Sequence, residues 1–146
     1  MCSQRQALAR FPRRVDDRER AGLIELSKRT GVRGGVAVNA LDSTLAVRDP
    51  NARLWPQTEL LKAALLAEAL TGSSAYATIA ANAASTLMKY LDTEVPGLWF
   101  DEQLPGGQFR VTPAPASTLY PLIGAVEALC RERRSPEIAA RVGPAG

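Results

Sequence analysis

Two side chains four residues apart, Trp55 and Glu59, form the arrangement in this chain best suited to holding a small hydroxylated ligand. At the start of a helix, residues at this spacing project from one face. An indole is a good platform for the apolar side of a hydroxylated ring, and a carboxylate accepts hydrogen bonds from hydroxyl groups. Arg53, just before them, could hold Glu59 ionised or contact an oxygen or phosphate of the ligand.

Trp99, in a later loop, could supply a second wall to such a pocket. Each tryptophan also has a purely structural interpretation, as a loop anchor packed on the core. Both interpretations stay open for Trp55 and for Trp99 at this point.

Acid–base chemistry is limited by the absence of histidine from all 146 residues. Imidazole is the usual general acid and base near neutral pH, so a mechanism that rests on it is excluded for this chain acting alone. A carboxylate that removed a proton from carbon would need a raised pKa and a dry pocket. The carboxylates and phenols in question are Glu59, Glu94, Asp101, Glu102, Tyr90 and Tyr120.

The composition is that of one ordinary folded domain. Hydrophobic residues make up 46% and charged residues 23% of the chain, and alanine and leucine favour helices. A net charge of +3 is mildly basic, not the concentrated charge of a dedicated nucleic-acid binder. Cys2 and Cys130, without histidine, predict neither a disulfide framework nor a metal site. No signal-peptide segment or membrane-length apolar run is found, so we expect a cytoplasmic protein without a membrane partner.

The elements that must position these residues are mostly helices. The pattern predicts helices over residues 16–30, 53–70, 76–91 and 117–133, the second apolar on most faces and therefore buried. The last carries one apolar stripe, Leu119, Ile123, Val126 and Cys130. Gly31 is expected to end the first helix in the C-cap position.

Short strands are expected in two of the connections. Residues 36–38 and 45–47 flank residues 39–44 and predict a small hairpin or an irregular loop. In the long connection 92–115, residues 98–101 and 108–111 predict a second hairpin across a Pro-Gly-Gly turn.

The resulting fold class is all-α, with paired helices that carry decorated loops at one end, as in a helical toroid. We expect residues 1–20 to be a basic, disordered arm, residues 21–134 the helical domain and residues 135–146 a loose tail. Four helices cannot close a ring, so we expect exposed apolar helix faces that self-association could cover. The arm is expected to be solvated, with nucleic-acid binding the less favoured alternative.

Two segments resemble the C-terminal part of the N-acylglucosamine 2-epimerase family, in the branch of mannose and mannose-6-phosphate isomerases. They are RLWPQTELLKA at residues 53–63 and PAPASTLY at residues 113–120, with Trp99-Phe100-Asp101 between them similar to an intervening loop of the family. The resemblance implies the C-terminal part of an (α/α)6 barrel and proton transfer next to a sugar carbonyl, with no metal or nucleotide cofactor. It also implies a monosaccharide or sugar-phosphate ligand bound by Arg53, Trp55, Glu59, Trp99 and Tyr120.

The chain departs from the family where catalysis is concerned. The family places a catalytic histidine directly after a Ser-Leu-Tyr-type triplet, and here Pro121 follows Tyr120. A second histidine belongs to a Gly-His-x-x-Glu-Trp-like segment that this chain lacks. Because proline cannot transfer a proton, we expect a truncated family member that is inactive alone. The alternative is a non-catalytic sugar-binding or regulatory remnant; a small basic helical protein that binds nucleic acid is less favoured.

Overall fold

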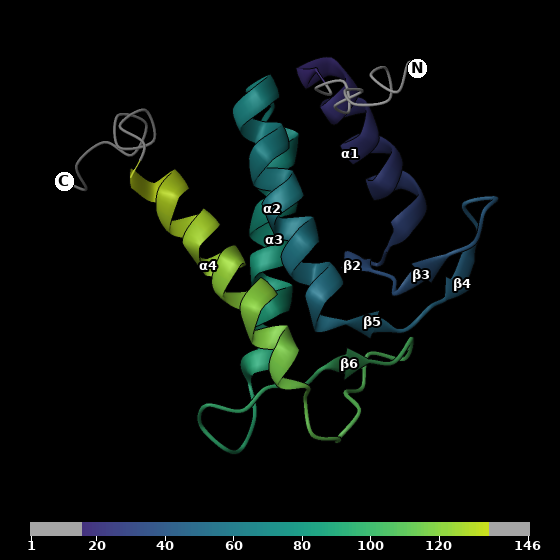
Figure 1. The fold of residues 1–146 in the computed structure, drawn as a ribbon, viewed down its shortest axis with the longest axis vertical. Coiled ribbons are helices and arrows are strands. Elements are labelled where there is room, and N and C mark those ends of the chain that lie inside the picture. Colours follow the sequence, from purple (N-terminus) through teal and green to yellow (C-terminus); the bar gives the residue numbers. More distant parts are fainter. Residues whose placement is uncertain (1–15, 135–146) are drawn as a thin grey trace, which may run out of the picture.

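Four α-helices form the body of the computed structural model, which describes residues 16–134 (Figure 1). They are α1 (Asp17–Gly31), α2 (Leu54–Thr71), α3 (Ser74–Leu91) and α4 (Leu119–Arg134), and a 3-10 turn over Ala116–Thr118 leads into α4. The strands form three antiparallel pairs: β1 (Val32–Arg33) with β2 (Val36–Ala37), β3 (Ala40–Leu41) with β4 (Val47–Asp49), and β5 (Ala52–Arg53) with β6 (Glu102–Gln103). The helical class with short hairpins in the loops is confirmed.

Helix directions alternate along the chain. In Figure 1, α2 and α4 rise from the end that carries the hairpins, whereas α1 and α3 run toward that end. Helix α2 lies in the middle and packs against α3, α4 and α1. The first residues of α2 and α4 therefore lie at the same end of the molecule.

Helix α1 begins with a capping box. The Glu19 N–H donates to Oδ1 of Asp16 at 2.8 Å, and the Asp16 N–H donates to Oε2 of Glu19 at 3.1 Å, so two free donors of the first turn are satisfied. The helix thus includes the last residues of the predicted basic arm. Residues 1–15 of that arm and the tail 135–146 lie outside the described residues. The predicted C-cap role of Gly31 is wrong, because Gly31 is the last helical residue and the extended residue Val32 caps the helix.

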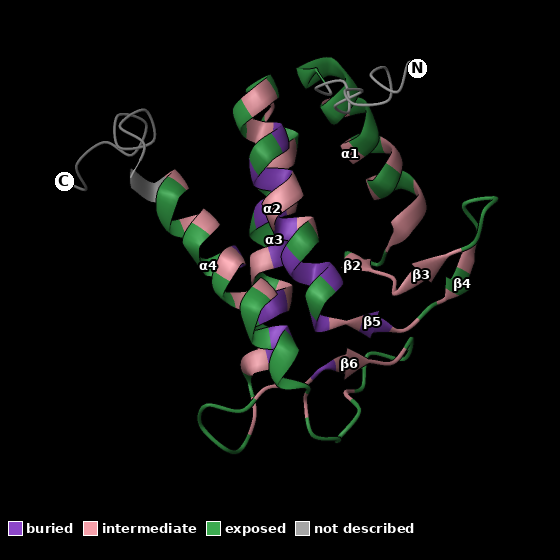
Figure 2. Cartoon of the chain, in the orientation of Figure 1, coloured by how far each residue is buried: buried purple, intermediate pink, exposed green. Residues whose placement is uncertain are grey.

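The core lies between α2 and α3, where Figure 2 shows most of the buried residues. Large side chains from both helices fill it, and buried alanines let the backbones approach closely. Its fully or nearly fully buried members are Leu54, Leu61, Ala64, Leu65, Ala80, Ala83, Leu87, Tyr90 and Ala125. Helix α2 ends at Gly72, whose φ of 65° is a left-handed conformation that glycine adopts without strain.

The first connection contains two hairpins where the sequence predicts one. Gly34 and Gly35, with φ of 57° and 83°, make a tight turn between β1 and β2. The second hairpin, β3–β4, follows immediately and closes between Leu41 and Val47. Because the glycine pair turns the chain early, residues 36–37 pair with β1, and residues 40–41 form the first strand of the second hairpin.

The predicted pairing of residues 98–101 with 108–111 is wrong in its register. The backbone of residues 100 and 101 bonds to the helices instead, because the Phe100 N–H donates to the Tyr90 carbonyl and the Asp101 carbonyl accepts from the Leu54 N–H, both at 2.8 Å. The strand starts at residue 102 rather than 98, as β6, and its main partner is β5. The Pro-Gly-Gly turn survives as a single bridge between Gln103 and Phe109.

Candidate functional site

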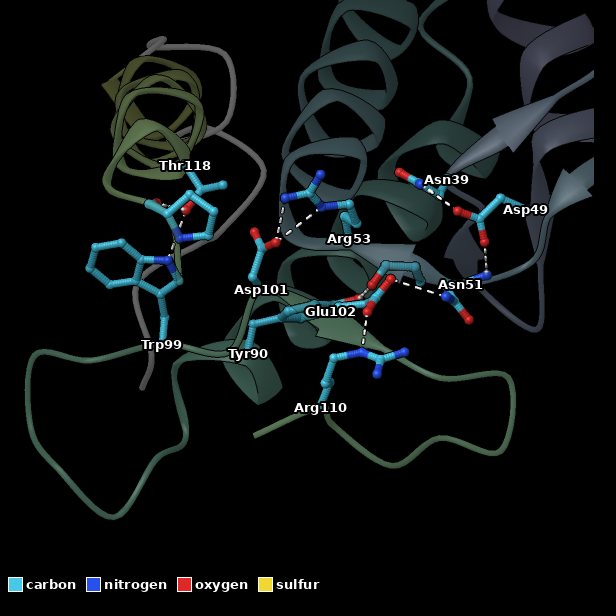
Figure 3. Close-up of polar contacts among 12 residues, drawn as sticks. Asn39, Asp49, Asn51, Arg53, Tyr90, Trp99, Asp101, Glu102, Arg110 and Thr118 are labelled. Atoms are coloured by element: carbon cyan, nitrogen blue, oxygen red, sulfur yellow. Dashed lines mark hydrogen bonds and ion pairs between the residues drawn. The ribbon is translucent and has the colours of Figure 1, made fainter. Parts of the chain in front are cut away.

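Arg53 and Asp101 form a two-pronged contact beside the first turn of α2 (Figure 3). Arg53 is the last residue of β5, and Asp101 directly precedes β6, so the pairing of these strands brings the two side chains together. Nε and Nη2 of Arg53 donate to the same oxygen, Oδ2 of Asp101, at 3.0 and 2.6 Å. The Asp101 side chain is 9% exposed, whereas that of Arg53 is 36% exposed, so the guanidinium is held from the protein side and remains open to a ligand.

The other carboxylate oxygen of Asp101, Oδ1, is buried and has no hydrogen-bond partner within residues 16–134. A buried acceptor without a partner is unfavourable by itself. The contact with Arg53 is therefore the main polar stabilisation of this side chain. Asp101 is better placed to orient Arg53 than to meet a ligand directly.

The alternative in which Arg53 keeps Glu59 ionised is not the arrangement that forms. Glu59 instead accepts an ion pair from Nζ of Lys62 at 2.6 Å, three residues further along α2. The reason is local geometry: Arg53 has extended backbone before the helix, and its side chain turns toward β6. Glu59 lies on the helix itself and is half exposed.

Tyr90 lies beneath this pair and is fully buried. Its hydroxyl donates to the Ala52 carbonyl at 2.8 Å, and its ring meets the edge of Phe109. Burial, together with the nearby charges of Asp101 and Glu102, raises the pKa of the Tyr90 phenol above its usual range. Tyr90 is therefore a protonated donor whose hydrogen bond to Ala52 holds β5 in place, and it cannot serve as a base at neutral pH.

Trp55 and Glu59 lie on one groove, which we name the α1–α2 groove. It has a volume of about 440 Å³ and lies between α1, the β3–β4 hairpin and the first half of α2. Trp55 is 44% exposed, so its indole face is available to a ligand. The rest of the wall is mainly apolar; its larger members are Leu23, Ile24, Leu41, Leu45, Leu60 and Ile79.

Leu45 gives this groove a fixed rim. Its φ of 65° is a left-handed conformation that a leucine rarely adopts, and it points to a turn fixed by its surroundings. The Asp42 carboxylate supplies this constraint by accepting from the Thr44 N–H at 2.8 Å and the Ala46 N–H at 3.1 Å. These bonds, and the one from the Thr44 hydroxyl, lower the pKa of Asp42, so the turn is charged and intact at neutral pH.

Trp99 does not reach the α1–α2 groove. It lines a separate hollow of about 580 Å³ between the two halves of the long connection. Its indole Nε1–H donates to the Thr118 hydroxyl at 2.9 Å, and that hydroxyl donates to the Pro115 carbonyl at 2.7 Å. The loop-anchor interpretation of Trp99 is therefore the one that its contacts favour.

Tyr120 and Pro121 open the last helix. Tyr120, the second residue of α4, is 81% exposed and contributes no core packing. Pro121 is the third residue, in the first turn, where its missing N–H would have no helical partner. Within one chain, therefore, Trp55 and Glu59 come together, whereas Arg53, Trp99 and Tyr120 each lie in a different setting.

Two buried polar residues that hold this region together, Gln57 and Asp101, were not predicted from the sequence to have that role. Gln57, which is fully buried, accepts from the Ala37 N–H at 2.8 Å and donates to the Ala37 carbonyl at 2.7 Å, so it fixes β2 against α2 beside the groove. Asp101 orients Arg53, as described above. The only sequence signal for either is that Gln57 and Asp101 fall inside the motifs RLWPQTE and Trp-Phe-Asp.

Residues 16–134 meet the requirements neither of a metal site nor of a membrane-spanning helix. No group of three or more His, Cys, Asp or Glu side chains there could hold a metal ion. No helix in this part of the chain is long and apolar enough to cross a bilayer.

Comparison with known proteins gives one consistent family. The model of N-acylglucosamine 2-epimerase (GlcNAc 2-epimerase) matches residues 18–125, well over half of the chain. A mannose-6-phosphate isomerase of Rhizobium meliloti (strain 1021) is 46% identical over 94 residues, which cover 62% of this chain and 24% of that protein.

A solved D-mannose isomerase shares the fold, with a TM-score of 0.71 at 20% identity. The similarity covers 84% of this chain and 32% of the isomerase, so the four helices correspond to part of its helical toroid. The chain spans about a quarter to a third of the length of these two relatives. This chain belongs to the N-acylglucosamine 2-epimerase family and is similar to the mannose isomerases within it.

Proposed function

We propose that this chain is a partial sugar isomerase or epimerase that does not catalyse proton transfer when it acts alone. The family's chemistry implies removal and return of a proton next to a sugar carbonyl, which needs a base poised near neutral pH. The observation that carries the proposal is the absence of histidine from the sequence, with Pro121 in the first turn of α4 where the resemblance implies one.

Three other acids and bases that the sequence offers are poorly suited to replace imidazole. Asp101 is buried and engaged by Arg53, and Tyr90 is buried with a raised pKa. Glu59 faces the groove but is half exposed and paired with Lys62. A water-exposed, paired carboxylate is a weak base toward a C–H bond.

The direct test is proton exchange, which is more sensitive than net turnover. The chain is incubated in D₂O with mannose, glucose, fructose or their 6-phosphates, and ¹H NMR follows loss of the signal next to the carbonyl. We expect no exchange above the buffer blank, while an intact mannose isomerase run in parallel exchanges the proton. Exchange by the purified chain that disappears in Glu59→Gln would overturn the proposal and assign the base to Glu59.

A second role, sugar binding without catalysis, is supported by the shared position of Trp55 and Glu59 on the α1–α2 groove. An aromatic platform with an adjacent carboxylate is a usual arrangement for a pyranose ring. Because the groove is open, we expect weak binding, with a Kd on the order of 1 mM.

Titration calorimetry or saturation-transfer NMR with mannose and mannose 6-phosphate measures this binding. Trp55→Ala should abolish it, whereas Leu98→Ala, a truncation in the separate hollow beside Trp99, should leave it intact. Binding that survives both Trp55→Ala and Glu59→Gln would place the sugar elsewhere and remove this role from the groove.

A further inference from the structure

A further cavity, which we name the basic hollow, lies between the β1–β2 hairpin, the end of α3 and the Pro-Gly-Gly turn after β6. It has a volume of about 500 Å³. Arg33, the last residue of β1, and Lys89, in the last turn of α3, are the only charged side chains of residues 16–134 that line it, and both are exposed. The basic hollow shares a single lining residue, Val38, with the α1–α2 groove, so the two are separate places in the fold.

Neither cation of the basic hollow has a carboxylate partner within residues 16–134. Six other cations in that part of the chain pair with an aspartate or a glutamate: Arg20, Lys28, Arg53, Lys62, Arg110 and Arg131. Two positive charges that line one hollow repel each other, and an anion between them turns this repulsion into attraction. The charge of the hollow therefore favours a negatively charged ligand.

Arg33 is held in place by the end of α1. Its Nη1 donates to the Arg29 carbonyl at 3.1 Å and to the Val32 carbonyl at 2.9 Å. The other two nitrogens, Nε and Nη2, make no hydrogen bond within the described residues. A guanidinium that is fixed at one nitrogen presents its remaining N–H groups as a rigid fork, and such a fork matches two oxygens of a phosphoryl group.

The turn on the other side of the basic hollow is also fixed. The Gly107 N–H donates to the Leu104 carbonyl at 2.8 Å, and Nε2 of Gln103 donates to the Gly107 carbonyl at 2.9 Å. A Cβ added at Gly34 or at Gly107 would meet open space, so no side chain covers the rim at these two positions. An anion can therefore approach the backbone of both turns closely.

We propose that the basic hollow binds a phosphoryl group, either free phosphate or the phosphate of an ester, between Arg33 and Lys89. A phosphate dianion balances the two positive charges, the guanidinium fork suits two of its oxygens, and the ammonium of Lys89 suits another. Because both cations are exposed, we expect weak binding with a Kd on the order of 1 mM, further weakened by salt. The site does not depend on sugar binding in the α1–α2 groove.

The first test is a titration of the ¹⁵N-labelled chain with inorganic phosphate at low salt, followed by ¹H–¹⁵N correlation spectra. The amide signals of Gly34, Gly106 and Gly107 report on the hollow, because all three residues line it. We expect their shifts to saturate with phosphate and to stay small with acetate at the same ionic strength. Shifts that fail to saturate, or that acetate reproduces, overturn the proposal.

Variants then test the two cations. Arg33→Gln and Lys89→Gln should each weaken phosphate binding about tenfold or more. Arg48→Gln is the matched control, because Arg48 is exposed, has no ion pair within residues 16–134 and does not line the hollow. It removes the same charge and should change the Kd less than about twofold. Equal weakening by Arg48→Gln would mean that only the total charge matters, and would overturn the proposal.

Folding of the variants is checked by circular dichroism and urea unfolding. Arg33→Gln removes the bonds to the end of α1, whereas Lys89 makes no hydrogen bond within the described residues. Lys89→Gln therefore keeps the proposal testable even if Arg33→Gln disturbs the helix. A folded Lys89→Gln that binds phosphate like the wild type overturns the placement of the ligand between the two cations.

Two phosphate ligands distinguish the sources of the phosphoryl group. Equal affinity for inorganic phosphate and glycerol phosphate means that the hollow recognises the phosphoryl group alone, and tighter binding of glycerol phosphate assigns an ester. Absence of glycine shifts with both overturns the proposal.

Ligands that each suit one place separate the basic hollow from the α1–α2 groove: inorganic phosphate for the hollow and mannose for the groove. Trp55→Ala should abolish the shifts caused by mannose and leave those caused by phosphate. Loss of the phosphate shifts in a folded Trp55→Ala variant would place the anion in the groove and overturn the proposal. Failure of mannose binding alone would count only against the sugar-binding role of the groove.

Discussion

Arg53 donates two hydrogen bonds to a single oxygen of Asp101, 48 residues later in the chain, while the second oxygen of that carboxylate lies buried without a partner. The contact joins the start of α2 to the start of β6, and the Leu54 N–H adds a backbone bond to the Asp101 carbonyl. The open face of the guanidinium is thereby fixed at the end of the molecule where the loops gather.

Asp101→Asn should destabilise the chain because it removes the charge that Arg53 pairs with inside a buried setting. We expect a loss of about 1–3 kcal/mol, at the lower end because Arg53 is partly exposed. Urea unfolding measures the change. Glu102→Gln, which weakens the more exposed pair with Arg110, is the matched control and should cost under about 1 kcal/mol. Equal losses in the two variants would mean that the burial of Asp101 does not increase the contribution of its ion pair to the free energy of unfolding.

Tyr90→Phe should leave the buried Ala52 carbonyl without its hydroxyl donor. The expected loss in the free energy of unfolding is about 1–3 kcal/mol, since the ring itself is retained. Thermal or urea unfolding tests it against Tyr120→Phe, which alters an exposed phenol and should change stability by less than about 0.5 kcal/mol. A neutral Tyr90→Phe would show that another donor satisfies the carbonyl.

Alkaline pH should unfold the chain partly through Tyr90. Its pKa is raised in the folded state, so in the unfolded state the phenol ionises near its ordinary pKa of about 10 while in the folded state it keeps its proton. This contribution is complete below that pH and is lost as pH rises above it. Unfolding curves at pH 9 and pH 11, with tyrosinate absorbance near 295 nm, should show a smaller decline for Tyr90→Phe than for the wild type. Parallel declines would contradict the assignment, because Tyr76, whose pKa is also raised, is present in both proteins.

Two glycine-to-alanine changes should have opposite signs. At Gly72 a Cβ meets open space, but the φ of 65° strains any L side chain, so Gly72→Ala should cost about 1 kcal/mol. At Gly124, inside α4, a Cβ also meets open space and the backbone is helical, so Gly124→Ala should gain about 0.5–1 kcal/mol. The midpoint of thermal unfolding reports both, and a gain at Gly72 would contradict the left-handed cap.

Releasing Trp99 should change its fluorescence more than the overall fold. Thr118→Val removes the hydroxyl that accepts from the indole N–H while keeping the side-chain volume. In a Trp55→Phe background, where Trp99 is the sole tryptophan, we expect a red-shifted emission and a loss of about 1 kcal/mol. Thr112→Val, at the rim of the same hollow, should leave the emission unchanged.

The helices were predictable because their signals are local. The apolar periodicity of α3 and the Gly72 stop of α2 each act within a few residues. Strand register is not local: β6 takes β5 as its partner, across about fifty residues, so the hairpin expected within the long connection was misplaced.

In the candidate site, too, the contacts set by local spacing were predictable and those set by long-range strand pairing were not. Trp55 and Glu59 share a groove because their helical spacing alone puts them on one face. The partner of Arg53 could not be read from the chain, since Asp101 is 48 residues away and reaches it through strand pairing. The apolar stripe predicted along α4 does not face the core, since Ile123 and Val126 are exposed. The helix packs on the core through Ala125, Ala128 and Leu129 instead.

The connections are unequal at the two ends of the helices. Between α2 and α3 only Gly72 and Ser73 intervene, whereas both long connections, 32–53 and 92–118, gather at the opposite end, beside the first turns of α2 and α4 (Figure 1). Insertions, deletions and sequence drift at that end need not disturb helix packing, while a single added residue at the short joint would shift one helix against the other. Changes of loop length and sequence are therefore tolerated mainly at the end with the long connections, whereas the two-residue joint between α2 and α3 fixes how those two helices pack.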